Sequence, residues 1–173
     1  MVSVPLPEKN DGGRRGYGQD RRDDEPNFEA LPDSVPPQNL EAEEAVLGGI
    51  LLDPDAIGRV ADVLQPEAFY LNAHREIFRT ALMLHGQGKP TDLTAMSAWL
   101  ADTGALEKVG GNNRLVELVE RVPSTASIEQ VARLVMDKFL RRQLIRSGNE
   151  VIQLGFDQSL PMEQVLDQAE QKI

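Results

Sequence analysis

The sequence predicts an all-α protein, a compact helical bundle followed by a long C-terminal helical hairpin. Three observations lead to this fold class. From about residue 40 onward, apolar residues recur every three or four positions, which is the spacing of one helix face. Aromatic residues make up only 5% of a chain that is 40% apolar, which indicates an aliphatic interior. No proline interrupts residues 124–160, so a single long helix fits there.

The composition argues against several classes of function. Without cysteine, the chain has no disulfide, no thiolate nucleophile and no cysteine-based metal site, which is compatible with a cytoplasmic location. The longest apolar run, residues 45–52, is far shorter than the roughly 20 residues of a membrane span, so no membrane contact is expected. The net charge of -10 disfavours a general affinity for nucleic acid, which comes mostly from Lys and Arg at phosphates.

Residues 1–35 are expected to form a disordered leader. They contain four Gly, four Pro, five basic and eight acidic residues, with few apolar side chains. Such a segment cannot bury enough surface to offset the entropy lost on ordering. Its GGRRGYGQDRR run is similar to an Arg/Gly nucleic-acid tail, but the acidic excess favours a solvated leader.

The helical globular subdomain is expected over residues 36–126 and begins with a helix capped by Asn39. Acidic residues fill its first turns, including Glu43 and Glu44, which we expect to be solvated and to favour the positive end of the helix dipole. One face is apolar, formed by Leu40, Val46, Leu47, Ile50 and Leu51.

Two features of this opening stretch predict specific local structure. Gly48 and Gly49 lie in mid-helix, where each costs roughly 1 kcal/mol relative to Ala, so we expect another backbone to approach closely there. Asp53 is expected to cap a second helix that has Pro54 at its first position.

Further along, a turn at Gln65-Pro66 precedes a helix from Asn72 that carries both histidines of the chain. His74 and His85 would lie about 16 Å apart along this helix, too far to share a metal ion. We therefore expect each to pack or to make a satisfied hydrogen bond.

Glycines and an aspartate delimit the next two helices. Asp92 is expected to cap a helix that ends at Gly104, and Gly110-Gly111 precedes a helix that runs to Pro123. Neither these glycines nor Gly88-Lys89 form a phosphate-binding loop, because no glycine-rich run is followed by Lys and then Ser or Thr. With no catalytic Ser/His/Asp or Cys/His set either, catalysis by this stretch is not expected.

The hairpin is expected over residues 127–173. Ser127 and Gln130 match a capping box, and the helix from Ile128 to about Leu154 would be roughly 40 Å long. Its apolar residues form two faces, and Gly155 with Ser159 would allow a reversal into a second helix that ends the chain without a C-cap, as if inside a longer protein. Because the apolar surface exceeds what one partner helix covers, we expect self-association through Val135, Phe139, Leu140, Leu144, Ile145, Val165 and Leu166.

Several runs resemble, in order, the N-terminal domain of replicative DNA helicases of the DnaB family. They are LEAEEAVLGGILLD, FYLNAHREIF, GKPTDL, the spaced VGG and VPSTAS with the helix after it. The resemblance implies a collar domain of a ring-shaped hexamer, built as a trimer of dimers through the hairpin, which binds primase and, as a further partner, a helicase loader. It also implies that ATP and Mg are used only by a separate C-terminal domain of the parent protein, which unwinds DNA; no cofactor is expected in this stretch.

The resemblance implies a primase surface at Arg114, Glu117 and Arg121. Arg114 stands where the family often has an aromatic residue, and Val131 where it often has Tyr, which implies a more charged contact. Two alternatives remain. One is the helicase-binding domain of a primase, and the other is a helical DNA-binding module that uses a positive stripe of Arg133, Lys138, Arg141, Arg142 and Arg146.

Overall fold

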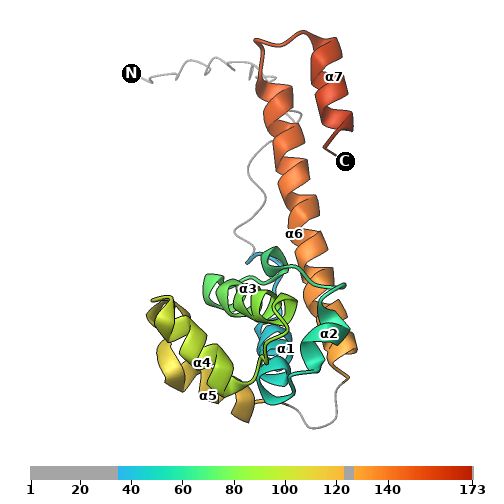
Figure 1. Ribbon diagram of the computed structural model, residues 1–173. Helices are drawn as coiled ribbons and strands as arrows, with labels where there is room; N and C mark the ends of the chain where they lie inside the picture. Colours follow the sequence, from blue (N-terminus) through green and yellow to red (C-terminus); the bar gives the residue numbers. More distant parts are fainter. Residues whose placement is uncertain (1–34, 123–126, 173) are drawn as a thin grey trace, which may run out of the picture. The chain divides into compact units, whose positions relative to one another are not determined.

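The computed structural model describes residues 35–122 and 127–172, and in these ranges every regular element is a helix (Figure 1), which confirms the all-α prediction. The predicted disordered leader lies outside the described residues, apart from Val35. The elements are α1 (Leu40–Leu52), α2 (Ala56–Val60), the 3-10 turn η1 (Pro66–Ala68), α3 (Asn72–Gly86), α4 (Leu93–Asp102), η2 (Glu107–Val109), α5 (Gly111–Glu120), α6 (Ile128–Phe156) and α7 (Met162–Glu170).

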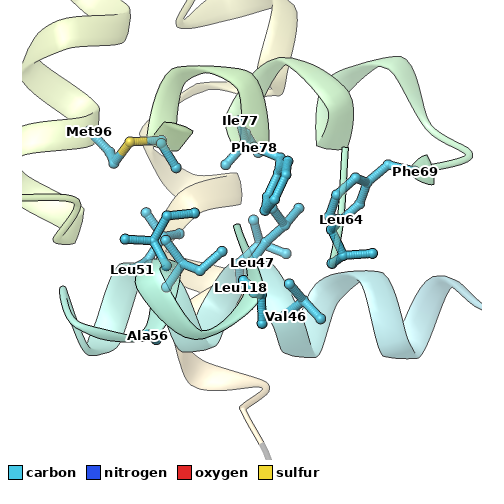
Figure 2. Close-up of a cluster of buried hydrophobic side chains, with 14 of the residues drawn as sticks. Val46, Leu47, Leu51, Ala56, Leu64, Phe69, Ile77, Phe78, Met96 and Leu118 are labelled. Carbon is cyan, nitrogen blue, oxygen red and sulfur yellow. The ribbon is translucent and has the colours of Figure 1, made fainter. Parts of the chain in front are cut away.

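Helix α1 is the centre of the packed part of the chain. It contacts α2, α3, α4, α5 and α6, and its side chains interleave with those of the surrounding helices (Figure 2). The Asn39 carboxamide caps it by accepting a hydrogen bond of 3.0 Å from the Ala42 N–H, as predicted. The predicted apolar face is buried apart from Leu40, which is 37% exposed at the start of the helix.

The close approach predicted at the paired glycines is confirmed. A Cβ on Gly48 would lie 2.1 Å from the carbonyl oxygen of Leu118 and 2.6 Å from a methyl of Val122. A Cβ on Gly49 would lie 3.2 Å from the Ile128 side chain. The two glycines thus let α1 pack directly against the backbone of α5 on one side and against the start of α6 on the other.

One predicted helix start and one predicted cap are wrong, although α6 begins at Ile128 as predicted. Helix α2 begins at Ala56 rather than Pro54, because the Asp53 carboxylate closes a turn with the Asp55 N–H (3.0 Å) and pairs with Arg59 (2.9 Å). The Ser127 side chain makes no capping bond to the backbone of α6; its hydroxyl instead donates to the carboxylate of Glu129.

The other predicted boundaries are close to the observed ones. The Asp92 carboxylate accepts hydrogen bonds from two N–H groups in the first turn of α4, and Gly104 follows that helix with a φ of +67°. Gly110 and Gly111 have φ values of +96° and +74° at the start of α5, a backbone conformation that favours glycine. Helix α5 ends at Glu120, shortly before the predicted end at Pro123.

Helix α6 has two environments along its 29 residues. Its first part is packed against α1 and α2, and its buried residues Ala132, Val135 and Phe139 belong to the same core as α1–α5. The rest continues outward and pairs with α7 after a reversal at residues 157–161 (Figure 1). We call residues 35–122 with 127–139 the head, and residues 140–172 the arm. The core thus extends past the boundary predicted at residue 127.

Candidate interaction surfaces

The arm presents apolar side chains that nothing in the described chain covers. Leu144 is 70% exposed, and several neighbours on α6 and α7 are also exposed, namely Leu140, Ile145, Ile152, Met162 and Leu166. Between them lies a groove of about 570 Å³ whose lining includes Leu140, Leu144, Val151 and Ile152. An apolar surface that runs along two paired helices is typical of a protein–protein interface.

The predicted association residues divide into two groups. Val135 and Phe139 are only 1% and 8% exposed because they pack in the head core, and Val165 is buried where α7 meets α6, so these three are not available to a partner. Leu140, Leu144, Ile145 and Leu166 are exposed on the arm. The sequence reasoning missed Ile152, although it lies eight residues after Leu144 and so on the same face of the helix.

The acidic pair at the start of α1 is not solvated, contrary to expectation. Glu43 is 1% exposed, and one carboxylate oxygen accepts the Tyr70 N–H at 2.7 Å while the other lies 2.8 Å from Nδ1 of His74, which is also buried. The expectation that His74 makes a satisfied hydrogen bond is therefore confirmed. A carboxylate is stable in such a site only when its oxygens are paired, and these two contacts provide that pairing.

The predicted primase residues form part of a charged cluster that joins α5 to α1. Arg114 donates to Glu44 at 2.6 Å and to Glu117 at 3.2 Å, and Arg121 donates to the other Glu44 oxygen at 3.0 Å. Burial by itself raises the pKa of Glu44, but the hydrogen bonds from Arg114 and Arg121 outweigh it and hold that pKa below the ordinary value of 4.5. The bond to Glu44 in turn raises the pKa of Arg114.

Arg114 also contacts the buried histidine. Its Nη2 lies 3.3 Å from Nε2 of His74, on the opposite side of the ring from the Glu43 contact at Nδ1. The Arg114 side chain is 23% exposed, so it is mostly occupied with these internal contacts, whereas Arg121 (58%) and Glu117 (50%) face the solvent.

The predicted positive stripe on α6 is not a free cationic surface. Arg141 and Lys138 both pair with Asp137, at 3.0 and 3.6 Å. Arg142 donates to two main-chain carbonyls of the head, so its guanidinium is engaged within the chain and is not free for a phosphate contact. Arg133 and Arg146 are exposed but lie more than three helical turns apart, so they do not form a cluster. The geometry therefore does not favour the DNA-binding alternative.

The described residues contain no group of three His, Asp or Glu side chains that could hold a metal ion. None of their helices is long and apolar enough to cross a membrane. A small cavity of about 490 Å³ lies at the start of α1, between Leu40, Glu41, Glu44 and Arg121.

A family model described as the DnaB-like helicase N terminal domain matches residues 35–137. The chain belongs to this family. The match ends two residues before Phe139, so it coincides with the head and stops where the arm begins.

Relatives of this DnaB-like domain are named replicative DNA helicases. The chain is 58% identical over 139 residues to the replicative DNA helicase DnaB of Nostoc sp., covering 80% of this chain and 16% of that protein. It is 41% identical over 143 residues to the replicative DNA helicase DnaC of Bacillus subtilis, covering 83% of this chain and 32% of that one. The chain thus spans a third or less of the length of these relatives.

Two solved structures share the fold of this DnaB-like domain. The crystal structure of the N-terminal domain of DnaB helicase from Mycobacterium tuberculosis has a TM-score of 0.76 and 38% identity, covering 80% of this chain and 98% of that one. A DnaB-like replicative helicase described with its interactions with primase has a TM-score of 0.65 and 29% identity, covering 78% of this chain and 32% of that one. The relatives found are helicases, which favours this family over a primase domain.

Proposed function

We propose that this domain is the self-association and primase-docking part of a longer ATP-dependent replicative helicase of the cytoplasm. The chain supplies the contacts, and a separate domain of the longer protein binds ATP and Mg and unwinds DNA. The observation that carries the proposal is the exposed apolar surface of the arm. In water alone this surface would be unfavourable, whereas a second arm placed against it would bury it.

A two-fold pairing of arms accounts for this surface best. In such a dimer every apolar contact of one arm is repeated by its copy, so each substitution acts twice. Burying one Leu side chain is worth roughly 1.5–3 kcal/mol. The exposed leucines at positions 140, 144 and 166 would then contribute enough for stable association, and further pairing of dimers would give the hexamer of the helicase.

Leu144→Asp tests the role of the arm, with Gln153→Asp as the matched control. Leu144 lines the groove, whereas Gln153 is an exposed polar residue nine positions later, on the opposite side of α6. Leu144→Asp is expected to weaken dimerisation by roughly 3 kcal/mol or more, since two charges would be buried per dimer. Multi-angle light scattering should show half the wild-type mass with an unchanged helical circular dichroism signal, and Gln153→Asp should keep the wild-type mass. A wild-type chain that is monomeric at high concentration would refute the proposal.

Primase docking is supported by the relative whose structure is described with its primase interactions. In this chain the accessible charges of the predicted surface are Arg121 and Glu117, while Arg114 is largely used within the domain. A helicase loader would be a second partner of the same domain. Charged rim contacts weaken as salt rises, which gives primase binding a testable signature.

The primase proposal is tested by titrating the cognate primase C-terminal domain at low and high salt. Affinity is expected to fall with salt, and Arg121→Glu should lower the low-salt affinity toward the high-salt value. Arg59→Glu, at an exposed arginine near the start of α6, is the matched control. Equal affinity at both salt concentrations would remove these charged residues from the docking surface.

A further inference from the structure

Arg142 occupies the point where the arm leaves the head. Its Nη1 donates to the Pro37 carbonyl at 2.7 Å and its Nη2 to the Ala68 carbonyl at 2.6 Å. These carbonyls belong to two separate segments of the head, the stretch before α1 and the end of η1. The guanidinium therefore ties α6 to two backbone positions that are far apart in the sequence.

The same guanidinium lies over two aromatic rings. Its carbon lies 5.7 Å from the centre of the Tyr70 ring and 5.9 Å from that of Phe139, both within the range of a cation–π contact. Phe139 is the last buried residue of α6, one turn before Arg142. Tyr70 is itself held in place, because its N–H donates to the buried Glu43.

Beyond this point, a small change in the direction of α6 produces a large displacement at its far end. From Arg142 to the end of α6 at Phe156 the helix extends about 21 Å, and the side chains along this stretch are exposed or half-buried. A change of ~10° in helix direction at Arg142 would displace the far end by about 4 Å. Small losses of constraint at the junction would thus have large effects at the association surface.

We infer that Arg142 is a positioning residue that sets the direction of the arm relative to the head. The packing of residues 128–139 in the core fixes where α6 starts, and Arg142 fixes the direction in which α6 leaves the head. Lysine is not expected to replace it, because its ammonium is a single nitrogen and lacks the two separate nitrogens with which Arg142 reaches the two carbonyls. The inference rests on the proposed function only in making the arm the association element; the direction of the arm is a property of one chain.

The test measures the distance between head and arm within one molecule. Because the chain has no cysteine, spin labels can be placed at Asp102→Cys on α4 and Gln153→Cys on α6, both exposed, without removing native thiols. Doubly labelled chains are mixed with a large excess of unlabelled chains of the same variant. Double electron–electron resonance spectroscopy then reports the distance between the two labels of one chain, even in an oligomer. Wild type, Arg142→Gln, Arg142→Lys and the control Arg141→Gln are compared.

The expected result is a distance distribution broader by about 3 Å or more in both Arg142 variants, because the label at position 153 lies about 16 Å along the helix from Arg142, with helical content unchanged. Arg141→Gln, which alters a neighbouring exposed arginine, should match wild type. Arg142→Lys keeps the charge and stem, so it decides the question if Arg142→Gln does not fold. Wild-type distributions in the Arg142 variants, or equal broadening in Arg141→Gln, would overturn the inference. Light scattering on the same proteins tests self-association separately. A wild-type chain that is monomeric would refute the dimer, and broadened distances in the Arg142 variants would still support the role of Arg142.

Discussion

The head and the arm are built from the same kinds of residue but use them differently. In the head, Leu47 is fully buried among side chains of its own chain, whereas Leu144 in the arm is 70% exposed. Buried aliphatic residues make the head stable as a single chain. The exposed ones contribute little to the stability of one chain and are available for a partner. The difference shows that helical periodicity locates apolar faces without saying which molecule covers them.

The largest expected difference between the two regions is at glycine. Gly48→Ala should destabilise the head by more than the ~1–3 kcal/mol usual for overpacking, because the new Cβ would meet a backbone carbonyl at 2.1 Å. Gly148→Ala in the arm meets no atom within 4 Å and should stabilise the helix by up to ~1 kcal/mol. Urea unfolding of both variants measures this difference. Equal effects would mean that α1 and α5 can separate without cost.

Leucine truncation tests the comparison directly. Leu47→Ala should lower the free energy of unfolding by about 2–5 kcal/mol, since it opens a cavity in the core. Leu144→Ala should change the stability of the monomer by less than ~0.5 kcal/mol. The measurement is chemical denaturation at concentrations low enough to keep the chain monomeric. A large loss in the free energy of unfolding for Leu144→Ala under those conditions would place this residue in a hydrophobic core.

A smaller effect is expected from pH, through Glu44. Because its pKa is lowered in the folded chain, its stabilising contribution is present above the unfolded value near 4.5 and is lost as pH falls through the folded value. Arg114→Gln should therefore reduce stability at neutral pH and flatten its decline below about pH 4.5. Urea midpoints measured from neutral to acid pH check this. A decline as steep as that of wild type would show that Arg114 does not hold the Glu44 carboxylate.

The smallest effect is expected at the exposed ion pair of the arm. Glu150 pairs with Lys172 at 2.7 Å, and this pairing lowers the pKa of Glu150, but both groups are well hydrated. Glu150→Gln should leave the melting temperature within error, because exposed pairs contribute little net stability. Glu43→Gln is the matched change in the head and should clearly lower the melting temperature, since the buried His74 loses its carboxylate partner. Equal shifts for the two variants would contradict the difference between the regions.

Much of the head could be predicted from local patterns in the sequence. Asn39, Asp92 and Gly104 act within a few residues of their own helices, so caps and ends follow from residue type and spacing. The paired glycines also predicted a close helix contact. The identity of the contacting backbone, that of Leu118, could not be predicted, because nothing local links the two positions.

The polar contacts of the site show the limit of such reasoning. Glu43 and Glu44 stand in the first two turns of α1, where acids are usually solvated, and only the tertiary fold brings His74, Arg114 and Arg121 to them. Arg142 had the spacing of a surface stripe, yet its partners are carbonyls 74 and 105 positions away. A long side chain at a helix surface can turn inward wherever unpaired backbone groups lie, and sequence spacing does not contain that information.

The central position of α1 has a consequence for how the chain folds during synthesis. Glu44 and Arg114 are 70 positions apart, and the Leu118 backbone that covers Gly48 is also made far later than α1. At a synthesis rate of ~5–20 residues per second, roughly 4 to 14 s pass between the synthesis of α1 and that of α5. During that interval its apolar face has only α2, α3 and α4 to pack against. The nascent domain therefore exposes apolar surface that chaperones can bind, until α5 and the first part of α6 emerge.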